Sequence, residues 1–424
     1  MNPRDYLDGL HGRGIKFGLD NIRFLLDAAG QPHTRFPCVH VGGTNGKGSV
    51  VAMLHAMARA AGYRVARFTS PHLIRLNERI VVDDACIDDA SLDGHLAAIR
   101  RDARAMDHAP TYFEAVTAAA FRQFADAHVD LALIEVGMGG RHDATNVILP
   151  EVAAITSIDF EHMQYLGDTL GQIASEKAGI LKPDVPAVVA DLCPEAREVV
   201  LARAAELDCP VAVAGRDFSY ALTGGPFARE FAYESASCRL GPVRLGLNAS
   251  FQGENAAIAV AVAERLSAAF PRIDAAAMES GLRTARWPCR LERVIESPPV
   301  IVDVAHNPAG ARKLAAELPE CVVVLAVSAD KAAAGIIDAL RPIARRLILT
   351  QYAYDRRMPL DALCAAAQAS RAAYERAASL PDAIALGLES ASDAVPLLIT
   401  GSIFTAGEAR TVLAERYGAP LPAF

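Results

Sequence analysis

The sequence predicts an α/β protein made of two consecutive domains, each built around a mainly parallel sheet. Short apolar runs alternate with helix-length segments along most of the chain, which is typical of parallel strands joined by crossover helices. A glycine-rich turn connects the first apolar run to a long helical segment. The alternation breaks around Thr284–Arg293 and then resumes. We therefore expect an N-terminal domain over residues 1–289 and a C-terminal domain over residues 290–424.

The N-terminal domain is expected to alternate strands and helices before its pattern changes. The strand candidates are Cys38–Val41, Arg64–Phe68, Leu131–Val136, Ala153–Ser157 and Ala187–Ala190. The helix candidates are Val50–Ala61, Phe113–Ala127, Thr169–Ile180 and Glu195–Leu207. Residues 216–247 then place aromatic side chains among Gly and Pro, which predicts a small β region of hairpins. Two helices follow, near Glu254–Ala269 and Asp274–Arg283.

The C-terminal domain repeats the alternation. Its strand candidates are Val300–Val304, Cys321–Val327, Arg346–Thr350 and Pro396–Thr400. Its helix candidates are Ala309–Leu318, Ala332–Ala344, Leu360–Ala369 and Ile403–Arg416. Ligands of such sheets bind beyond the carboxyl ends of the strands, so we expect a site in a cleft between the two domains.

The composition is that of a globular chain, with 52% hydrophobic and 22% charged residues over 424 positions and a formal net charge of −8. No block of Lys and Arg stands out, so we expect no nucleic-acid partner. The start lacks the apolar core of a secretory signal, and runs such as Cys321–Val327 are too short to span a membrane. The 8 cysteines form no C-x-x-C pair, which favours a reduced, cytoplasmic chain without a zinc or iron–sulfur site. We also expect a monomer.

The turn at residues 42–49, Gly-Gly-Thr-Asn-Gly-Lys-Gly-Ser, has the composition of a phosphate cradle. Its glycines let backbone N–H groups approach phosphate oxygens, and the N-terminus of the following helix adds positive potential. Lys47 can reach the terminal phosphates, and the hydroxyl of Ser49 can hold Mg²⁺. The order departs from the common loop, because Gly48 separates the lysine from the hydroxyl and Val41 stands where the first glycine is usual. An ordinary glycine turn is the alternative, but the four features together favour nucleotide binding.

Glu114 allows two interpretations. It follows Thr111 by three residues at the start of a predicted helix, which is the spacing of a capping box. Alternatively, its carboxylate is a magnesium ligand near the phosphate-binding turn. The segment by itself favours the cap.

Lys177 also allows two interpretations. It shares one face of a predicted helix with Leu170 and Ile173, so its side chain is expected to point with the apolar residues. In the last turn a cation complements the helix dipole, and a long stem can reach solvent. A desolvated lysine instead loses its charge, and the neutral amine can take up CO₂ to form a metal-binding carbamate.

Further polar residues follow predicted strands. Arg141 ends the glycine-rich segment Glu135–Arg141 and can clamp a carboxylate or a phosphate, although a plain turn would also explain the glycines. His162 has acidic neighbours that suit a metal ligand, although a lone histidine is more often structural. The segment that opens with Asp303 has a recognisable helix cap and first-turn proline, which leaves Asp303 and His306 without a structural explanation.

Taken together, these segments resemble the Mur ligase superfamily, and within it the folylpolyglutamate synthase and dihydrofolate synthase family. The matching stretches run in family order and span nearly the whole chain: Gly43–Ser49, Thr69–Leu73, Phe113-Glu114, Glu135–Asn146, Leu166–Thr169, Glu176–Ile180 and Asp303–Pro308. Each stretch is weak evidence by itself, and the ordered set is highly specific.

The resemblance implies an N-terminal P-loop ATPase domain followed by a Rossmann-like glutamate-ligase domain. It implies that ATP is bound by Thr44, Asn45, Gly46, Lys47, Gly48, Ser49, Asn255, Arg290 and Asp303. It implies two Mg²⁺ ions held by Ser49, Ser70, Glu114 and His162, and a carbamate on Lys177. The candidates on the folate side are Phe17, Gly18, Leu19 and Arg141. The candidates for catalysis are Lys47, Lys177 and, as a base by position only, His306.

The implied reaction is the ATP-dependent addition of L-glutamate to a folate, and also to 7,8-dihydropteroate, through an acyl phosphate with release of ADP and phosphate. The partners are therefore small molecules, and the two domains are expected to close before transfer because water would destroy the acyl phosphate. A muramyl ligase is one alternative, but the 41 residues before Gly42 are too few for the extra domain such enzymes carry. A nucleotide-dependent switch without ligase activity is the other.

Overall fold

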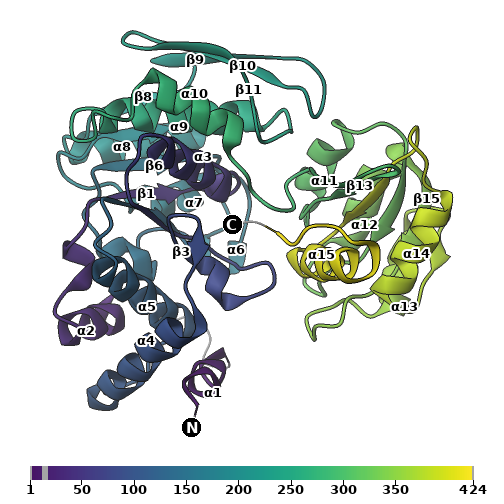
Figure 1. Cartoon of the computed structure of the whole chain (residues 1–424), viewed down its shortest axis with the longest axis horizontal. Coiled ribbons are helices and arrows are strands. Elements are labelled where there is room, and N and C mark those ends of the chain that lie inside the picture. The colour runs from purple at the N-terminus through teal and green to yellow at the C-terminus, as the bar shows by residue number, and fades with distance from the viewer. Residues whose placement is uncertain (1, 12–17, 423–424) are drawn as a thin grey trace.

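The computed structural model describes residues 2–11 and 18–422, which form two lobes joined near residue 290 (Figure 1). The larger, N-terminal lobe contains an eight-stranded and a three-stranded sheet, and the C-terminal lobe contains a six-stranded sheet. Separate hydrophobic cores lie on the two faces of each of the larger sheets. The fold is therefore α/β, as the alternation of strands and helices predicts.

The eight-stranded sheet has the order β4-β3-β2-β5-β1-β6-β7-β8. Its strands are β1 (Cys38–Gly42), β2 (Val65–Phe68), β3 (Ile80–Val82), β4 (Ala85–Cys86), β5 (Leu131–Glu135), β6 (Val152–Ile155), β7 (Ala187–Val189) and β8 (Val211–Val213). Neighbouring strands are parallel except that β3 is antiparallel to β2 and to β4. Strand β1 lies between β5 and β6, so the glycine-rich turn opens at the middle of the carboxyl edge, where such sheets bind ligands.

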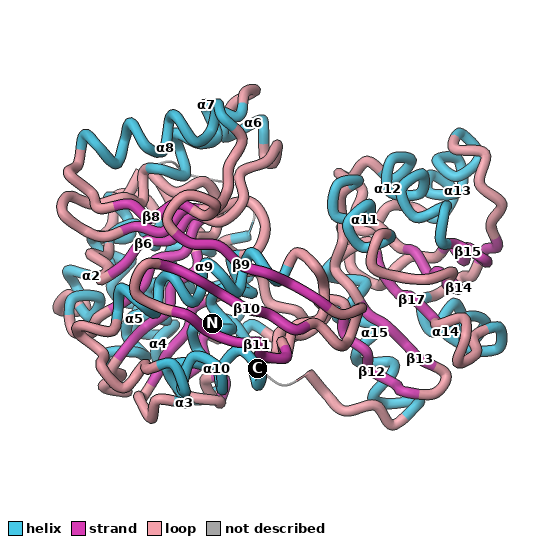
Figure 2. Tube along the Cα trace, turned by 90° about the horizontal axis from the view of Figure 1, so that it is seen from above, coloured by secondary structure: helices cyan, strands magenta, loops and turns pink. Residues whose placement is uncertain are grey.

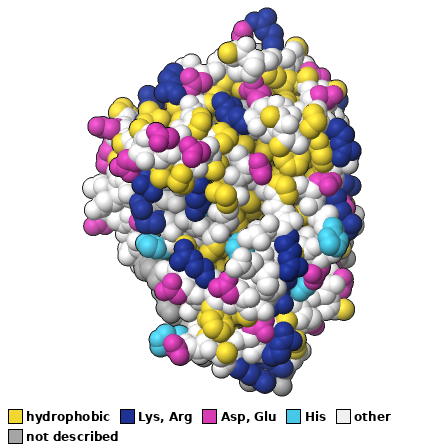
Figure 3. All heavy atoms as spheres, turned by 90° about the vertical axis from the view of Figure 1, so that its left-hand side faces the viewer, with side chains coloured by type: hydrophobic (Ala, Val, Ile, Leu, Met, Phe, Trp, Pro, Cys, Tyr) yellow, Lys and Arg dark blue, Asp and Glu magenta, His cyan; other side chains and the backbone are white. Residues whose placement is uncertain are grey.

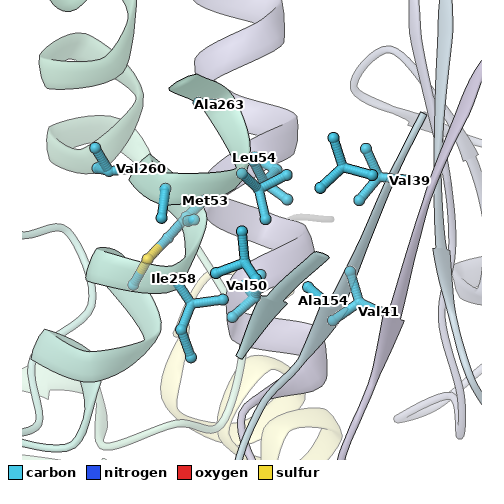
Figure 4. Close-up of a cluster of buried hydrophobic side chains, with 14 of the residues drawn as sticks. Val39, Val41, Val50, Met53, Leu54, Ala154, Ile258, Val260 and Ala263 are labelled. Atoms are coloured by element: carbon cyan, nitrogen blue, oxygen red, sulfur yellow. The ribbon is translucent and has the colours of Figure 1, made fainter. Parts of the chain in front are cut away.

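Helices cover both faces of this sheet. One face carries α3 (Lys47–Ala60), α7 (Leu170–Ala178), α8 (Pro194–Glu206), α9 (Gln252–Leu266) and α10 (Ala275–Thr284). The other carries α1 (Pro3–Asp8), α2 (Asp20–Ala28), α4 (Asp89–Asp102) and α5 (Tyr112–Asp126), and the short α6 (Met163–Leu166) precedes α7. In the core of the first face, Val39 and Val41 of β1 point toward Val50 and Leu54 of α3, with Ile258 of α9 beside them (Figure 4). This packing fixes α3, and with it the turn that precedes α3.

The small β region has the predicted hairpin form. Strands β9 (Phe218–Thr223), β10 (Glu230–Ser235) and β11 (Arg239–Arg244) form an antiparallel sheet in the order β11-β10-β9. Seen from above, this sheet forms a separate layer on the larger lobe (Figure 2). It packs closely on α9, since a Cβ atom added at Gly253 would lie 2.7 Å from the ring of Tyr220.

The C-terminal sheet has the order β12-β13-β17-β14-β15-β16 and is parallel except for β12. Its strands are β12 (Glu292–Glu296), β13 (Pro299–Val302), β14 (Cys321–Leu325), β15 (Ala344–Leu349), β16 (Glu375–Arg376) and β17 (Leu397–Thr400). Its helices are α11 (Pro308–Ala315), α12 (Ala333–Leu340), α13 (Leu360–Ala369), α14 (Leu380–Ser390) and α15 (Ile403–Tyr417). The remaining short 3₁₀ turns are η2 (Pro32–Thr34), η3 (Leu76–Arg79), η4 (Ala103–Ala105), η5 (Ala144–Val147) and η6 (Arg341–Ile343).

Several elements differ from the sequence prediction for identifiable reasons. The predicted helix Ala332–Ala344 ends at Leu340, because Pro342 has no N–H to donate and its ring obstructs a continuing helix. Helix α4 is not apparent in the sequence, since it buries little more than Leu92, Leu96 and Ile99. The edge strand β16 is exposed and so has no apolar run to reveal it.

The charge of the surface and the hydropathy of the helices are relevant to the question of nucleic-acid and membrane partners. On the face of the larger lobe that points away from the C-terminal lobe, cationic and anionic side chains are interspersed (Figure 3). Within residues 2–11 and 18–422, no helix combines the length and the hydropathy that crossing a membrane requires.

Candidate active site

The glycine-rich turn adopts a conformation that only glycine allows at two positions. Gly43 has φ +139°, and a Cβ atom there would lie 1.9 Å from Oγ1 of Thr156. Gly46 has φ +94°, and a Cβ atom there would lie 2.2 Å from Oδ1 of Asn255. The turn is therefore pressed against the loop after β6 and against α9, which hold it open toward the carboxyl edge of the sheet.

Two lysine side chains converge on one carbonyl group of this turn. Nζ of Lys47, the first residue of α3, donates to the carbonyl oxygens of Gly43 at 3.1 Å and of Thr44 at 3.0 Å. Nζ of Lys177 donates to the same oxygen of Gly43 at 2.8 Å. Thr44 is itself fixed, since its hydroxyl donates to the carbonyl of Asp159 at 3.2 Å. Two lysine amines therefore lie beside a turn that is suited to bind anions.

Lys177 is buried, with 2% of its surface exposed, so its stem does not extend to solvent. Burial, and then the nearby charge of Lys47, lower the pKa of Lys177 to about 7. At neutral pH a large share of this amine is therefore uncharged and nucleophilic. That is the state from which a carbamate forms.

Most of the residues expected to contact ATP line one cavity between the lobes, of about 80 Å³. Its lining includes Asn45, Gly46, Ser49 and Asn255 of the larger lobe, Arg290, and Asp303 and His306 of the C-terminal lobe. Gly48 lines an adjoining cavity that Arg290 also lines. The structure thus brings together residues that lie far apart in the sequence, from Asn45 to His306.

Asp303 and His306 also have local roles that the sequence did not reveal. The carboxylate of Asp303 accepts hydrogen bonds from the N–H of Leu291 at 2.8 Å and of Ala305 at 2.7 Å, so it fixes the end of the interdomain linker. Burial raises the pKa of Asp303, and the charge of Arg290 opposes that shift. Nδ1 of His306 lies 3.0 Å from the carbonyl oxygen of Val304 and must donate to it, which leaves Nε2 able to accept a proton.

The four candidate magnesium ligands lie around two neighbouring cavities. Ser49 lines the 80 Å³ cavity between the lobes, called the cleft cavity below. Ser70, Glu114 and His162 line a second cavity of about 370 Å³. Among the described residues, no group of three or more His, Cys, Asp and Glu side chains is placed to hold a metal ion. Three of the four candidates are oxygen donors, and one carboxylate with two hydroxyl groups fits Mg²⁺, which usually keeps several waters and binds one or two carboxylates together with substrate phosphates.

Glu114 forms the capping box that its spacing predicts. Its Oε2 accepts from the backbone N–H of Thr111 at 2.7 Å and from Nδ2 of Asn21 at 3.2 Å, and its N–H donates to the hydroxyl of Thr111. The side chain still lines the 370 Å³ cavity, so the cap orients the carboxylate without removing it from a cavity. His162 is more exposed and has its Nε2 3.6 Å from Oε1 of Glu161. Burial lowers the pKa of His162, which favours the neutral form that metals bind.

The 370 Å³ cavity, called the apolar cavity below, suits a flat, largely apolar ligand. Its apolar and aromatic lining includes Leu10, Tyr112, Phe113, Met138, Ala144 and Leu166. Its polar lining includes His11, Arg79, His142 and Asp143. One wall requires glycine, since a Cβ atom added at Gly137 would lie 2.4 Å from the ring of Phe113.

The candidates for the folate side are not all at this cavity. Arg141 does not line it, because Nε of Arg141 bonds Oε1 of Glu176 at 3.3 Å and one terminal nitrogen donates to the carbonyl of Ser175. Gly18 and Leu19 lead into α2, and Phe17 lies outside the described residues. Tyr112 and His142 line the apolar cavity but were not predicted from the sequence, although His142 lies within the family-like stretch 135–146.

Glu135 is a further buried carboxylate that sequence reasoning passed over. It ends β5, is 5% exposed, and accepts the N–H of Ser70 at 3.1 Å. Burial raises its pKa, and the charge of Lys47 is the main opposing influence. Its position could have been recognised in the sequence, because an acidic residue there ends a fully apolar strand.

Comparison with known proteins agrees with this arrangement. Residues 41–263 match the Mur ligase middle domain, and residues 289–403 match the Mur ligase glutamate ligase domain. A dihydrofolate synthase/folylpolyglutamate synthase of Bacillus subtilis is 35% identical, over 96% of this chain and 98% of the relative. Folylpolyglutamate synthase of Lacticaseibacillus casei is 34% identical, over 92% of this chain and 93% of the relative.

Solved structures give the same result. The folylpolyglutamate synthase of Mycobacterium tuberculosis complexed with ADP has a TM-score of 0.89 at 35% identity, over 97% of both chains. Escherichia coli FolC in complex with DHPP and ADP has a TM-score of 0.85 at 29% identity, also over 97% of both chains. The chain therefore belongs to the Mur ligase superfamily of ATP-dependent ligases and, within it, to the family of folylpolyglutamate and dihydrofolate synthases.

Proposed function

We propose that this chain joins L-glutamate to tetrahydrofolate and to its glutamylated forms, using ATP and releasing ADP and phosphate. The observation that carries the proposal is the convergence of Lys47 and Lys177 on the carbonyl of Gly43, beside an apolar cavity large enough for a flat ring system. A carboxylate is a poor electrophile, so amide formation requires activation. Transfer of the terminal phosphate of ATP to the carboxylate gives an acyl phosphate, which the amine of glutamate then attacks with release of phosphate.

The residues that bind ATP in this proposal come from both lobes. Backbone N–H groups of the turn from Thr44 to Ser49 and the N-terminus of α3 hold the phosphates, and Lys47 neutralises the charge that moves with the transferred group. Asn255, Arg290 and Asp303 complete the site from around the cleft cavity. Because both lobes contribute, the lobes must be correctly placed for transfer to occur.

Magnesium and a carbamate complete the proposed centre. Ser49, Ser70, Glu114 and His162 would hold two Mg²⁺ ions, which neutralise phosphate charge and align the reacting oxygens when bound. A carbamate on Lys177 would add oxygen donors to those of Ser49, Ser70 and Glu114. For the carbamate we expect that Lys177→Ala abolishes turnover and that a small carboxylate such as acetate or formate partly restores it. A wild-type rate of Lys177→Ala without additive would remove the carbamate from the mechanism.

The base that removes a proton from the attacking amine is assigned here to His306. Its ring donates through Nδ1 to Val304, which leaves Nε2 as the acceptor, and burial lowers its pKa so that the neutral form is available at pH 7. His306→Ala with unchanged glutamate-dependent turnover would withdraw this assignment.

Dihydropteroate is the second proposed acceptor. The Bacillus subtilis and Mycobacterium tuberculosis relatives carry both synthase names, and FolC was solved with DHPP. The same apolar cavity would take the pterin ring of either acceptor, since the two rings have the same shape and size apart from one step of reduction, and the acceptors otherwise differ in the group that bears the reacting carboxylate. We further propose a cytoplasmic monomer whose two domains meet at residue 290, a division supported by the start of the six-stranded sheet at Glu292.

Oxygen tracing tests the proposed chemistry. The acceptor carboxylate is labelled with ¹⁸O, and the released phosphate is analysed by mass spectrometry after turnover with ATP and glutamate. We expect one labelled oxygen in each phosphate released by the first addition, because the phosphate leaves the acyl phosphate with an oxygen of the labelled acid. Phosphate without label would contradict the acyl phosphate. ADP release measured with each acceptor separately, with and without glutamate, then decides between one acceptor and two.

A further inference from the structure

A further cavity between the lobes, of about 740 Å³, has six arginines in its lining. Its charged lining consists of Arg244, Arg283, Arg286, Arg290, Arg293 and Arg410, with Glu292 and Glu296. The whole chain has a formal net charge of −8, so this concentration of arginine runs against the composition. We propose that this arginine cavity binds a linear oligocarboxylate, namely the γ-linked glutamate tail that repeated turnover adds to the acceptor. The identity of the ligand rests on the proposed function.

Arg410 of α15 gives the cavity a buried guanidinium group whose position is already fixed. The residue is 1% exposed, and one terminal nitrogen lies 3.4 Å from Oε1 of Glu292. Among the residues that the structure describes, neither Nε nor Nη1 of Arg410 has a hydrogen-bond partner. Buried donors left unpaired are unfavourable, and carboxylate oxygens are their strongest natural partners. Glu292 does not block the site, because its Oε2 is bound by the N–H of Cys289 at 2.9 Å.

Three of the other arginines are held in place and keep donors available, although Arg293 also pairs with Glu296 at 3.3 Å. Arg244 donates to the carbonyl of Phe227 at 2.8 Å, and Arg293 lies 4.2 Å above the ring of Phe227. Arg286 donates to the carbonyl of Ala285 at 2.9 Å. Each guanidinium has five N–H donors, so these contacts leave several to bind carboxylates. The arginines come from both lobes, which suits a ligand with several charges along a chain.

The arginine cavity adjoins the candidate active site. Trp287, Pro288 and Arg290 line both it and the small cavity formed by Ser70 and Glu135. Ser70 also lines the apolar cavity. The ring of the acceptor stays in the apolar cavity, and its reacting end stays at the phosphate-binding turn. The glutamate chain between them must therefore loop outward as it lengthens. The arginine cavity adjoins that path, and each added glutamate brings one more carboxylate to it.

Tryptophan fluorescence provides a direct binding assay, because Trp287 lines the cavity and is the only tryptophan of the chain. γ-Linked pentaglutamate is titrated into the full-length protein, with monomeric glutamate and tripolyphosphate as comparison ligands. We expect a saturable change with pentaglutamate and a much weaker one with glutamate. No saturable change with pentaglutamate would overturn the proposal. Tighter binding of tripolyphosphate than of pentaglutamate would assign the cavity to phosphate chains and would also overturn it.

Two variants and a control locate the binding. Arg244→Gln/Arg283→Gln changes exposed side chains and should fold normally, while Arg410→Gln removes the buried guanidinium. Each should raise the pentaglutamate midpoint roughly tenfold, as expected for lost charge-assisted hydrogen bonds. Arg345→Gln, exposed and outside the cavity lining, should leave the midpoint unchanged. Unchanged midpoints in both cavity variants would place the binding elsewhere.

Kinetics separate this inference from the proposed function. In Arg244→Gln/Arg283→Gln we expect a higher KM for a tetraglutamyl folate and an unaltered KM for the monoglutamyl form. Equal effects on both acceptors would contradict a tail site. If the wild-type protein releases no ADP in response to glutamate with either acceptor, the proposed function fails, whereas the fluorescence titration still decides whether the cavity binds an oligocarboxylate.

Discussion

At the scale of single residues, the buried amine of Lys177 is the least usual feature of this protein. Its amine donates to the carbonyl of Gly43 and lies near the second cation, Lys47, and the charges of Glu161 and Asp143 offset only part of the effect of burial. A desolvated charge is unfavourable, so the folded state releases the proton that the unfolded chain would keep. The same desolvation that prepares this amine for a carbamate therefore makes it a cost to stability when protonated.

This cost predicts a pH-dependent stability. The pKa of Lys177 is about 7 in the folded chain against an ordinary value of 10.5, so between these values the unfolded state binds more protons. Its contribution to the free energy of unfolding therefore falls as pH decreases from 10.5 to 7 and is lowest below 7. In urea unfolding in CO₂-free buffer, Lys177→Met should remove a rise on the order of a few kcal/mol between pH 7 and pH 9.5. The exposed Lys313→Met should keep that rise, and a wild-type rise in Lys177→Met would refute the assignment.

Lys47 tests the phosphate-binding turn directly. Its ammonium group is held by two carbonyl groups of the turn, so it is positioned before nucleotide binds. We expect Lys47→Ala to lower kcat roughly 10²-fold or more, because a preorganised charge at the transferred phosphate is lost. Steady-state ADP release measures this effect, and thermal unfolding of the same variant should show that the fold is intact. A decrease of less than about threefold would mean that Lys47 does not touch the reacting group.

At the scale of elements, the junction between β1 and α3 depends on the contact of its backbone with α9. Gly46→Ala combines a φ of +94° with a Cβ atom 2.2 Å from Oδ1 of Asn255. We expect a loss of roughly 2–4 kcal/mol in unfolding free energy, together with weaker ATP binding, because the backbone must shift. Gly94→Ala is the matched control. It lies exposed in α4 with nothing within 4 Å of the added atom, so it should stabilise the protein by about 0.5–1 kcal/mol. Similar urea midpoints for the two variants would contradict this account.

At the scale of the whole molecule, one buried ion pair links the lobes. The carboxylate of Glu317 accepts from Arg229 at 2.7 Å and from the N–H of Ser250 at 2.7 Å, so the C-terminal lobe is tied to the larger lobe on the side of the three-stranded sheet. Both the cleft cavity and the arginine cavity are lined by residues of the two lobes. The relative position of the lobes therefore decides whether either site is complete.

Glu317→Ala should weaken this link. It leaves Arg229 with only its bond to the carbonyl of Gly224 and removes the acceptor of the part-buried N–H of Ser250. We expect this to cost on the order of 2–3 kcal/mol in urea unfolding, given that Arg229 is partly exposed. The variant should also raise the KM for ATP, because the cleft cavity is assembled from both lobes. Glu320→Ala is the control, since its carboxylate is largely exposed and 3.9 Å from Arg345, and it should change stability by less than about 0.5 kcal/mol. Equal losses in the two variants would exclude a role for the ion pair in joining the lobes.

The sequence by itself determined the features that depend on neighbouring residues. The strand, turn and helix around Gly42–Ser49, the capping box of Glu114 and the alternation of elements follow from local conformational preference and periodicity. Where an observed boundary differs from the predicted one, the cause is also local, as at Pro342. Elements that were not predicted are too polar or too short to show a hydrophobic period. Family-like stretches in order were sufficient to indicate the ligase.

Only the tertiary structure decided how distant segments surround one another. A lysine on the apolar face of a helix can reach water or be sealed in, and the packing of α7 beneath the turn after β1 sealed Lys177 against Gly43. The apolar cavity, the carboxylate of Glu135 and the arginine cavity likewise arise where segments far apart in the chain meet. Burial and electrostatic environment are set by that meeting, which short-range sequence patterns do not encode.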